Sequence, residues 1–195
     1  MILKFPPHGL KPTDEDWAEF TANLRISFAA PHANVTRLIG ICCDLDVKHS
    51  AADSHVAEPP AGSHCLVFER AQHGSIFDHF NAERSELRIP PWFDPAKPAA
   101  ALLQIALGLV HLHSNGIIHR DLAADNVLVF EEEKKADAAD SKESKSVFTL
   151  KLADFGKARA MDASGRYLQG SDNGARLHWM APEALRNAFS EKSDV

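Results

Sequence analysis

The chain has 195 residues, of which 45% are hydrophobic and 25% are charged, a composition typical of folded proteins. This excludes collagen-like, wholly disordered and disulfide-scaffold classes. Lys and Arg total 21 against 27 Asp and Glu, and a net charge of −6 argues against a nucleic-acid-binding protein, because neutralising phosphates requires clustered cations. The longest near-apolar run, 98–110, is too short to span a bilayer, so we expect a cytoplasmic protein or the cytoplasmic part of a larger one.

The first part of the chain is expected to contain one helix and two strands. Thr13 precedes three acidic residues, a pattern typical of a helix N-cap, and predicts a helix that ends near Pro31. The segments 35–43 and 64–68 have strand-like composition. The polar stretch 44–63 between them indicates a long loop.

The next part of the chain predicts a long helix and two further strands. Asp94-Pro95 is typical of a helix start, and apolar residues then repeat at helical spacing up to Asn115-Gly116. The segments 127–130 and 148–152 are expected to be strands. Only Glu, Lys, Asp, Ala and Ser occur in 131–146, so we expect a solvated insertion there, or at most a surface helix.

Two acidic motifs indicate phosphoryl transfer. In the segment 119–126, H-R-D-L-A-A-D-N, an Asp and an Asn lie five residues apart. Asp121 can accept or orient the proton of a substrate hydroxyl, and the amide oxygen of Asn126 can bind Mg²⁺. Asp154, at the start of D-F-G, supplies a carboxylate for Mg²⁺ bound to nucleotide phosphates. A third motif, W-M-A-P-E, covers 179–183.

These three motifs, in this order, resemble those of a eukaryotic-type protein kinase catalytic domain, closest to the tyrosine kinase and tyrosine-kinase-like groups. The resemblance extends over nearly the whole chain and implies an α+β, two-lobed kinase fold. An N-terminal lobe without the Gly-rich loop, but with the helix called C, would cover 1–70. A helical C-terminal lobe would cover 71–195 and end at the start of helix F. Both lobes are expected to be incomplete, with loop insertions at 44–63 and 131–146.

The resemblance implies a protein kinase that transfers the γ-phosphoryl group of ATP to a Ser, Thr or Tyr hydroxyl of a protein substrate, with ATP and Mg²⁺ as cofactors. The catalytic residues would be Asp121, Arg120 and Asn126, and Asn126 and Asp154 would bind the metal. The remaining nucleotide contacts would be Lys4 at the phosphates, Phe68 as gatekeeper, Glu69 to Ala71 as backbone groups at the adenine, and Leu128 beneath it.

The resemblance also implies structural roles around the site. Asp194, at the start of helix F, would stabilise the catalytic loop, and Gly74 would precede the next helix. We interpret His119 as a buried packing residue beside Phe155. Tyr167, between D-F-G and A-P-E, is either a regulatory phosphorylation site that pairs with Arg120 or an exposed loop tyrosine. Ser164 and Ser171 are rival sites.

Several residues depart from the family pattern. Asn23 stands where a Glu in helix C is expected, although Glu19, one turn earlier, could replace it. Ala123 and Asp125 stand where serine/threonine kinases and tyrosine kinases, respectively, carry a basic residue, so the charge that stabilises the transferring phosphoryl must come from elsewhere. Arg176 replaces a Pro of the tyrosine kinases. Three hypotheses follow: an active kinase, a pseudokinase that binds nucleotide as a regulatory module, or a truncated fragment without function.

Overall fold

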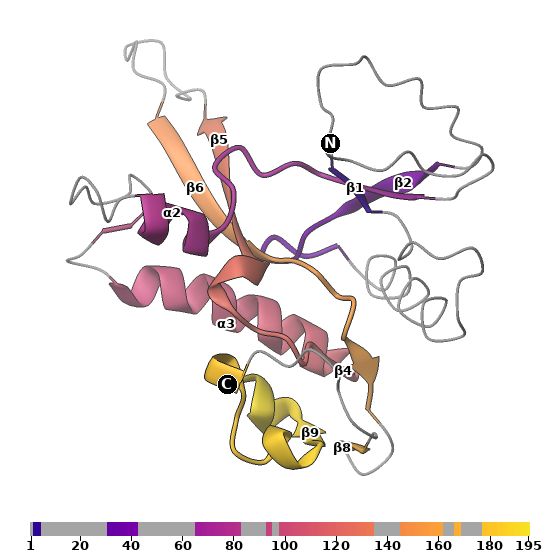
Figure 1. Cartoon of the computed structure of the whole chain (residues 1–195). Coiled ribbons are helices and arrows are strands. Elements are labelled where there is room, and N and C mark those ends of the chain that lie inside the picture. Colours follow the sequence, from indigo (N-terminus) through magenta and orange to yellow (C-terminus); the bar gives the residue numbers. More distant parts are fainter. Residues whose placement is uncertain are drawn as a thin grey trace.

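The computed structural model describes residues 2–4, 31–42, 65–82, 93–94, 98–134, 145–161, 166–168 and 177–195. The expected N-terminal helix, with Glu19 and Asn23, lies outside these residues, as do the whole 44–63 loop and Ser164, Ser171 and Arg176. Figure 1 shows a small sheet at one end of the molecule and the C-terminal segment at the other, with a long helix and a hairpin between them. None of the helices in the described part of the chain is long and apolar enough to cross a membrane.

The small sheet has three antiparallel strands in the order β1-β3-β2. They are β1 (Ile2–Lys4), β2 (Leu38–Cys42) and β3 (Cys65–Phe68). The central strand β3 is better shielded than β2, because Leu66 and Phe68 are both buried, whereas β2 alternates between exposed and half-buried side chains. Both strands expected in this part are therefore confirmed, with slightly narrower bounds.

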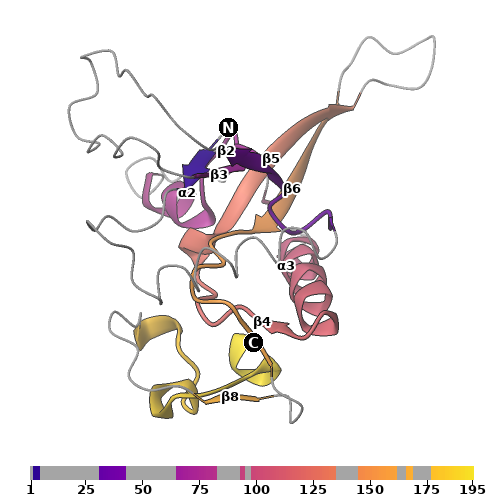
Figure 2. The same ribbon diagram turned by 90° about the vertical axis from the view of Figure 1, so that its right-hand side faces the viewer.

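The hairpin consists of β5 (Val127–Lys134) and β6 (Lys145–Leu152), paired from Val127↔Leu152 to Lys134↔Lys145. Both expected strands are confirmed, but each is longer than its apolar core. The expectation of a loop over 131–146 was wrong at both ends, because 131–134 and 145–146 belong to the strands. Figure 2 shows this end of the hairpin extending away from the other elements. Cross-strand hydrogen bonds satisfy the backbone there, so the segment needs no apolar side chains to be ordered as a strand.

Two helices follow the sheet. The short helix α2 (Ile76–Ala82) begins after Gly74, as expected, and Ser75 caps it: its Oγ accepts the Asp78 N–H at 3.1 Å, and the Asp78 carboxylate accepts the Ser75 N–H at 2.9 Å. The long helix α3 (Pro98–Ser114) ends at the expected Asn115-Gly116, where Gly116 has a φ of +71°. Residues 95–97 lie outside the described residues, so the expected helix start at Asp94-Pro95 stays a prediction.

The core forms where α3 packs against the hairpin. Leu109 and Leu112 of the helix meet Val129, Leu150 and Leu152 of the strands, all of them buried. Gly108 allows this close approach, since a Cβ atom there would lie 2.6 Å from the Asn34 carbonyl oxygen. The hairpin and α3 thus form a rigid base for the loops that leave their ends.

The remaining described elements are short, and the C-terminal ones lie below α3 in Figure 1. Two pairs of strands are antiparallel: β4 (Ile117–Ile118) with β7 (Arg159–Ala160), and β8 (Arg166–Leu168) with β9 (Ala188–Ser190). The 3₁₀ helices are η2 (Ala124–Asn126), η3 (Leu177–Trp179), η4 (Ala184–Arg186) and η5 (Glu191–Asp194). Together, β4, η2 and β7 position the two acidic motifs.

Candidate active site

The loop that contains Asp121 is hydrogen-bonded to the side-chain carboxylate of Asp194, near the C-terminus. Asp194 is buried, and its two oxygens accept the backbone N–H groups of His119 at 2.7 Å and Arg120 at 2.8 Å. His113 of α3 contacts the same carboxylate at 3.0 Å. Arg120 has a left-handed backbone, with a φ of 68°, a conformation that a non-glycine residue keeps only when its surroundings hold it. The expected role of Asp194 is confirmed, although it lies in the 3₁₀ helix η5.

His119 connects this loop to the D-F-G motif. Its Nε2 lies 3.1 Å from the Ala153 carbonyl oxygen, and its ring centroid lies 5.4 Å from that of Phe155, so the expected packing contact is confirmed. Its Nδ1 accepts the Asp121 N–H at 3.3 Å. Complete burial lowers the pKa of His119, and the neighbouring Asp194 carboxylate only partly opposes this. The ring is therefore neutral at pH 7, with one nitrogen donating and the other accepting.

Asn126 fixes the carboxylate of Asp121. The amide nitrogen of Asn126 donates to the Asp121 carbonyl oxygen at 2.7 Å and to the Asp121 carboxylate at 3.2 Å. The Asn126 carbonyl oxygen accepts the Ala153 N–H at 2.9 Å. The residue immediately before Asp154 is thus hydrogen-bonded to Asn126, and the structure brings the Asp121, Asn126 and Asp154 segments together.

Asp154 and Phe155, neighbours in the D-F-G motif, differ sharply in burial. Phe155 is 1% exposed, whereas Asp154 is exposed and has a left-handed backbone with a φ of 59°. The Gly156 N–H donates to the Asp154 carboxylate at 3.4 Å. The phenylalanine of this motif is therefore part of the core, whereas its aspartate is accessible to solvent.

Lys157 is a site residue that sequence analysis missed. Its Nζ lies 3.6 Å from Oδ1 of Asp121, with the lysine side chain 30% exposed and the aspartate side chain 10% exposed. Two signals in the sequence could have found it: its place directly after D-F-G, and the lack of a basic residue at Ala123 or Asp125.

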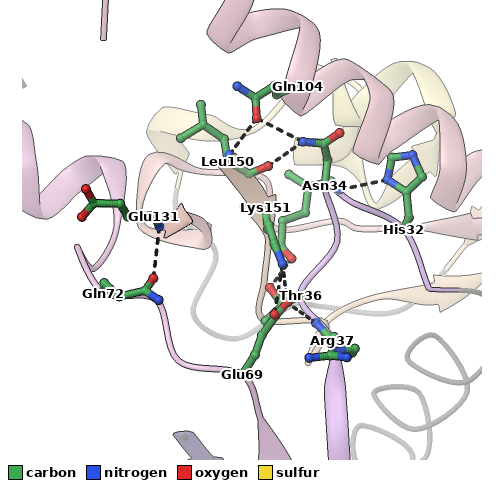
Figure 3. A network of polar contacts seen from close by, with 11 residues as sticks. His32, Asn34, Thr36, Arg37, Glu69, Gln72, Gln104, Glu131, Leu150 and Lys151 are labelled. Atoms are coloured by element: carbon green, nitrogen blue, oxygen red, sulfur yellow. Dashed lines mark hydrogen bonds and ion pairs between the residues drawn. The ribbon is translucent and has the colours of Figure 1, made fainter. Parts of the chain in front are cut away.

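The expected adenine-binding segment follows β3. Phe68 and Ala71 are buried, and Figure 3 shows the Glu69 side chain between Lys151 and Arg37. Lys151 Nζ lies 2.9 and 3.0 Å from the two Glu69 carboxylate oxygens, and the Arg37 N–H donates to the same group at 2.8 Å. The Glu69 N–H itself donates to the Arg37 carbonyl oxygen at 3.1 Å, so the backbone of this segment is anchored to the strand region before it.

Leu128 and Lys4 lie on elements that flank this segment. His73 and Gly74 exchange backbone hydrogen bonds with Val129, at 3.3 and 2.9 Å, and Leu128 forms an isolated bridge with Ser75. The backbone of Lys4 pairs with Leu66, which lies two residues before the expected gatekeeper Phe68 on the same strand.

Tyr167 lies on β8, where its backbone pairs with Phe189 of β9. The guanidinium carbon of Arg120 lies 4.2 Å from the centroid of the Phe189 ring, and Arg120 Nη1 donates to the Lys157 carbonyl oxygen at 3.2 Å. The structure therefore brings the Tyr167 backbone close to the residue on which Arg120 stacks.

A cavity of about 650 Å³ opens beside the loop. Asp121 and Ala123 line it from the catalytic loop, Ile105 from α3, and Trp179 and Ala181 from the third motif.

Comparison with known proteins agrees with this geometry. The family model described as protein tyrosine and serine/threonine kinase matches residues 9–195. The serine/threonine-protein kinase STY46 of Arabidopsis thaliana is 30% identical over 178 residues, which cover 91% of this chain and 24% of that protein. The human tyrosine-protein kinase FRK is 30% identical over 190 residues, covering 95% of this chain and 30% of FRK. The inactive tyrosine-protein kinase kin-32 of Caenorhabditis elegans is 32% identical over 167 residues, covering 84% of this chain and 14% of kin-32. The chain thus spans less than a third of the length of these relatives.

Proposed function

Because the chain belongs to the protein tyrosine and serine/threonine kinase family, we propose that it transfers the γ-phosphoryl group of ATP to a Ser, Thr or Tyr hydroxyl of a protein substrate. The observation that carries this proposal is the arrangement of Asp121, Asn126 and Asp154. The side-chain amide of Asn126 donates to the Asp121 carboxylate at 3.2 Å. The backbone carbonyl oxygen of Asn126 accepts the N–H of Ala153, the residue before Asp154, at 2.9 Å.

The side chains at this site fit Mg²⁺. The amide nitrogen of Asn126 is committed to Asp121, so its amide oxygen is the atom available to a metal. The exposed carboxylate of Asp154 is the second hard oxygen donor, and Mg²⁺ needs few protein ligands when phosphate oxygens and water complete its shell. Bound Mg²⁺ and ATP would supply the phosphoryl group and neutralise its charge.

Asp121 would then orient the acceptor hydroxyl. The bond between the γ-phosphorus and the β–γ bridging oxygen breaks, a bond from the acceptor oxygen to phosphorus forms, ADP leaves, and Asp121 takes the hydroxyl proton. The contacts from Asn126 and Lys157 restrict the rotation of the Asp121 carboxylate, which favours this role.

The adenine would bind along the segment after β3. Phe68 would close the back of its pocket, the backbone of Glu69 to Ala71 would hydrogen-bond its edge, and Leu128 would pack beneath its ring. The ion pair of Glu69 with Lys151 supports this assignment, because it fixes the backbone that would contact the base. Lys4, on the strand paired with β3, would contact the phosphates.

The same proposal divides the chain into two lobes and gives Tyr167 a role. Residues 1–70 would form the N-terminal lobe and 71–195 the C-terminal lobe, with the nucleotide between them. Phosphorylated Tyr167 would pair with Arg120 and order the segment between the second and third motifs. The pairing of the Tyr167 backbone with Phe189, the ring under Arg120, supports this assignment.

The direct test is phosphate transfer from radiolabelled ATP with Mg²⁺ to a protein acceptor and to a copolymer of glutamate and tyrosine. We expect the chain to label at least one of them, and Asp121→Asn to lower the rate about 100-fold or more. Glu132→Gln, at an exposed carboxylate of β5, is the matched control and should keep the wild-type rate. Identification of the phosphorylated amino acid then distinguishes Ser or Thr from Tyr. Transfer no faster than that of Asp121→Asn would refute the proposal.

A pseudokinase is the second candidate, and the absence of a basic residue at Ala123 and Asp125 favours it. In that case Mg²⁺ and ATP would raise the melting temperature of the chain, and Asp154→Asn would abolish the shift, without any transfer. An active kinase would show both the shift and the transfer.

A further inference from the structure

We propose that Lys157 supplies the positive charge that stabilises the transferring phosphoryl group beside Asp121, in place of the basic residue that the catalytic loop lacks. This inference rests on the proposed phosphoryl transfer and adds a catalytic residue to it. Neither Ala123 nor Asp125 can supply such a charge, and Lys157 comes from a different loop, directly after D-F-G.

The first argument is the position of the ammonium group. Lys157 Nζ lies 3.6 Å from Oδ1 of Asp121, while Oδ2 of the same carboxylate is bound by Asn126 at 3.2 Å. The two oxygens of the proposed base thus have different partners. A lysine side chain that is 30% exposed still reaches the solvent-accessible side of Asp121, where an acceptor hydroxyl and a phosphoryl group would approach.

The second argument is that the backbone of Lys157 is held in place. Its carbonyl oxygen accepts Arg120 Nη1 at 3.2 Å, which connects it directly to the catalytic loop. The next residue, Ala158, is fully buried and donates its N–H to the Phe155 carbonyl oxygen at 3.1 Å. The backbone of Lys157 is therefore already ordered while its side chain extends toward Asp121. This order reduces the conformational entropy that is lost when the lysine binds an anion.

The third argument is that the nearby cations have other partners in the described part of the chain. Lys151 forms the ion pair with Glu69, and Arg159 Nη1 donates to the Gly156 and Ala158 carbonyl oxygens at 3.0 and 2.8 Å. Arg120 stacks on Phe189. Lys157 Nζ lies 3.6 Å from the carboxylate of the proposed catalytic base.

The charge has a defined task in the reaction. As the bond from the γ-phosphorus to the β–γ bridging oxygen breaks and the bond to the acceptor oxygen forms, negative charge is spread over the three other oxygens of the phosphoryl group. The Lys157 ammonium would donate hydrogen bonds to one of them and keep its own protons, while the hydroxyl proton passes to Asp121. Removal of one such donor lowers kcat by about 100- to 1,000-fold in known cases.

The test compares variants of the full chain by kcat, KM for ATP and nucleotide-induced melting shift. Lys157→Met should lower kcat about 100-fold and change KM less than about threefold, with a melting shift like the wild type. Lys157→Arg should keep at least a tenth of the activity. Lys192→Met, at an exposed lysine of η5, is the matched control and should behave as the wild type.

A rescue separates a catalytic from a structural role. Ala123→Lys introduces a cation two residues after Asp121, and Ala123 and Asp121 both line the 650 Å³ cavity. Added to Lys157→Met, this substitution should restore kcat by about tenfold or more.

Three outcomes would overturn the assignment of Lys157. If the wild type transfers phosphate and Lys157→Met keeps its kcat, this inference is wrong and the proposed function stands. If neither Lys157→Arg nor Ala123→Lys recovers activity, the role of Lys157 is structural. If the wild type transfers no phosphate, the proposed function fails and the inference fails with it.

Discussion

The carboxylate of Asp194 accepts the backbone N–H of His119 at 2.7 Å, although the two residues are 75 positions apart in the chain. Its other oxygen accepts the N–H of Arg120 at 2.8 Å. The geometry around Asp121 is therefore set from outside the loop that contains it, by a buried carboxylate that binds two backbone N–H groups and the His113 side chain.

The substitution Asp194→Asn should destabilise the fold. An amide of the same size keeps one acceptor but turns a donor toward a backbone N–H, and it removes the charge that strengthens both hydrogen bonds. We expect the free energy of unfolding to fall by about 3 kcal/mol, measured by urea titration with tryptophan fluorescence. Glu191→Gln, an exposed carboxylate of η5, is the control and should change it by less than about 0.5 kcal/mol. Equal effects of the two substitutions would show that the buried contacts contribute little.

Local residue types predicted much of the site, and long-range side-chain pairs were the part that they could not predict. Asp121, Asn126 and Asp154 are recognisable because their chemistry requires particular residue types at short spacings. The ion pair of Lys151 with Glu69 joins residues 82 positions apart, and the contact of Lys157 with Asp121 also crosses two loops. Such pairs depend on how the hairpin packs, which no local pattern encodes.

The errors in the expected elements have a similar origin. Composition predicted that 131–146 could not bury apolar surface, but strands β5 and β6 extend into it through backbone pairing, helped by a 2.7 Å contact between Glu131 and His73. The expected helix start at Asp94-Pro95 stays a prediction, because 95–97 lie outside the described residues and α3 is described from Pro98.

The ion pair between Lys151 and Glu69 should stabilise the fold measurably. The two side chains are only 11% and 15% exposed, the contact is bidentate, and Lys151 Nζ lies 4.4 Å from the centroid of the Phe130 ring. We expect Lys151→Met to lower the free energy of unfolding by about 2 kcal/mol. A cycle with Glu69→Gln should give a coupling energy of about 1 kcal/mol or more. Additive effects would contradict the pairing.

The close approach of α3 to the segment before β2 makes Gly108 intolerant of a side chain. In Gly108→Ala the new Cβ would lie 2.6 Å from the Asn34 carbonyl oxygen and 3.0 Å from a methyl group of Leu152. Because the Asn34 carbonyl oxygen belongs to the backbone and cannot move away easily, we expect the free energy of unfolding to fall by about 2 kcal/mol. The midpoint of chemical denaturation measures this change.

Gly40→Ala is the matched control for this substitution. No atom of the described residues lies within 4 Å of a Cβ at Gly40, so the free energy of unfolding of Gly40→Ala should differ from that of the wild type by less than about 0.5 kcal/mol. If Gly108→Ala proved equally neutral, the packing of α3 on Asn34 would have to be looser than the structure shows.

The buried His119 should make the stability of the fold depend on pH. Burial lowers the pKa of His119 in the folded state below the ordinary value of 6.5. As the pH falls below 6.5, His119 therefore becomes protonated in the unfolded chain before it does in the folded chain. Its contribution to stability is therefore fully present above pH 6.5 and is lost as the pH falls, with a slope of at most about 1.4 kcal/mol per pH unit. The proton would also displace the Asp121 N–H from Nδ1.

Urea unfolding at several values between pH 5 and pH 7.5 measures this slope. His119→Gln removes the titrating group, so its stability should fall less steeply toward low pH than that of the wild type, even if it is lower throughout. Substitution of the exposed His178 by Gln controls for the loss of a histidine elsewhere and should leave the slope unchanged. The same slope in the wild type and in His119→Gln would mean that His119 accepts a proton in the folded state, against its contacts with Asp121 and Ala153.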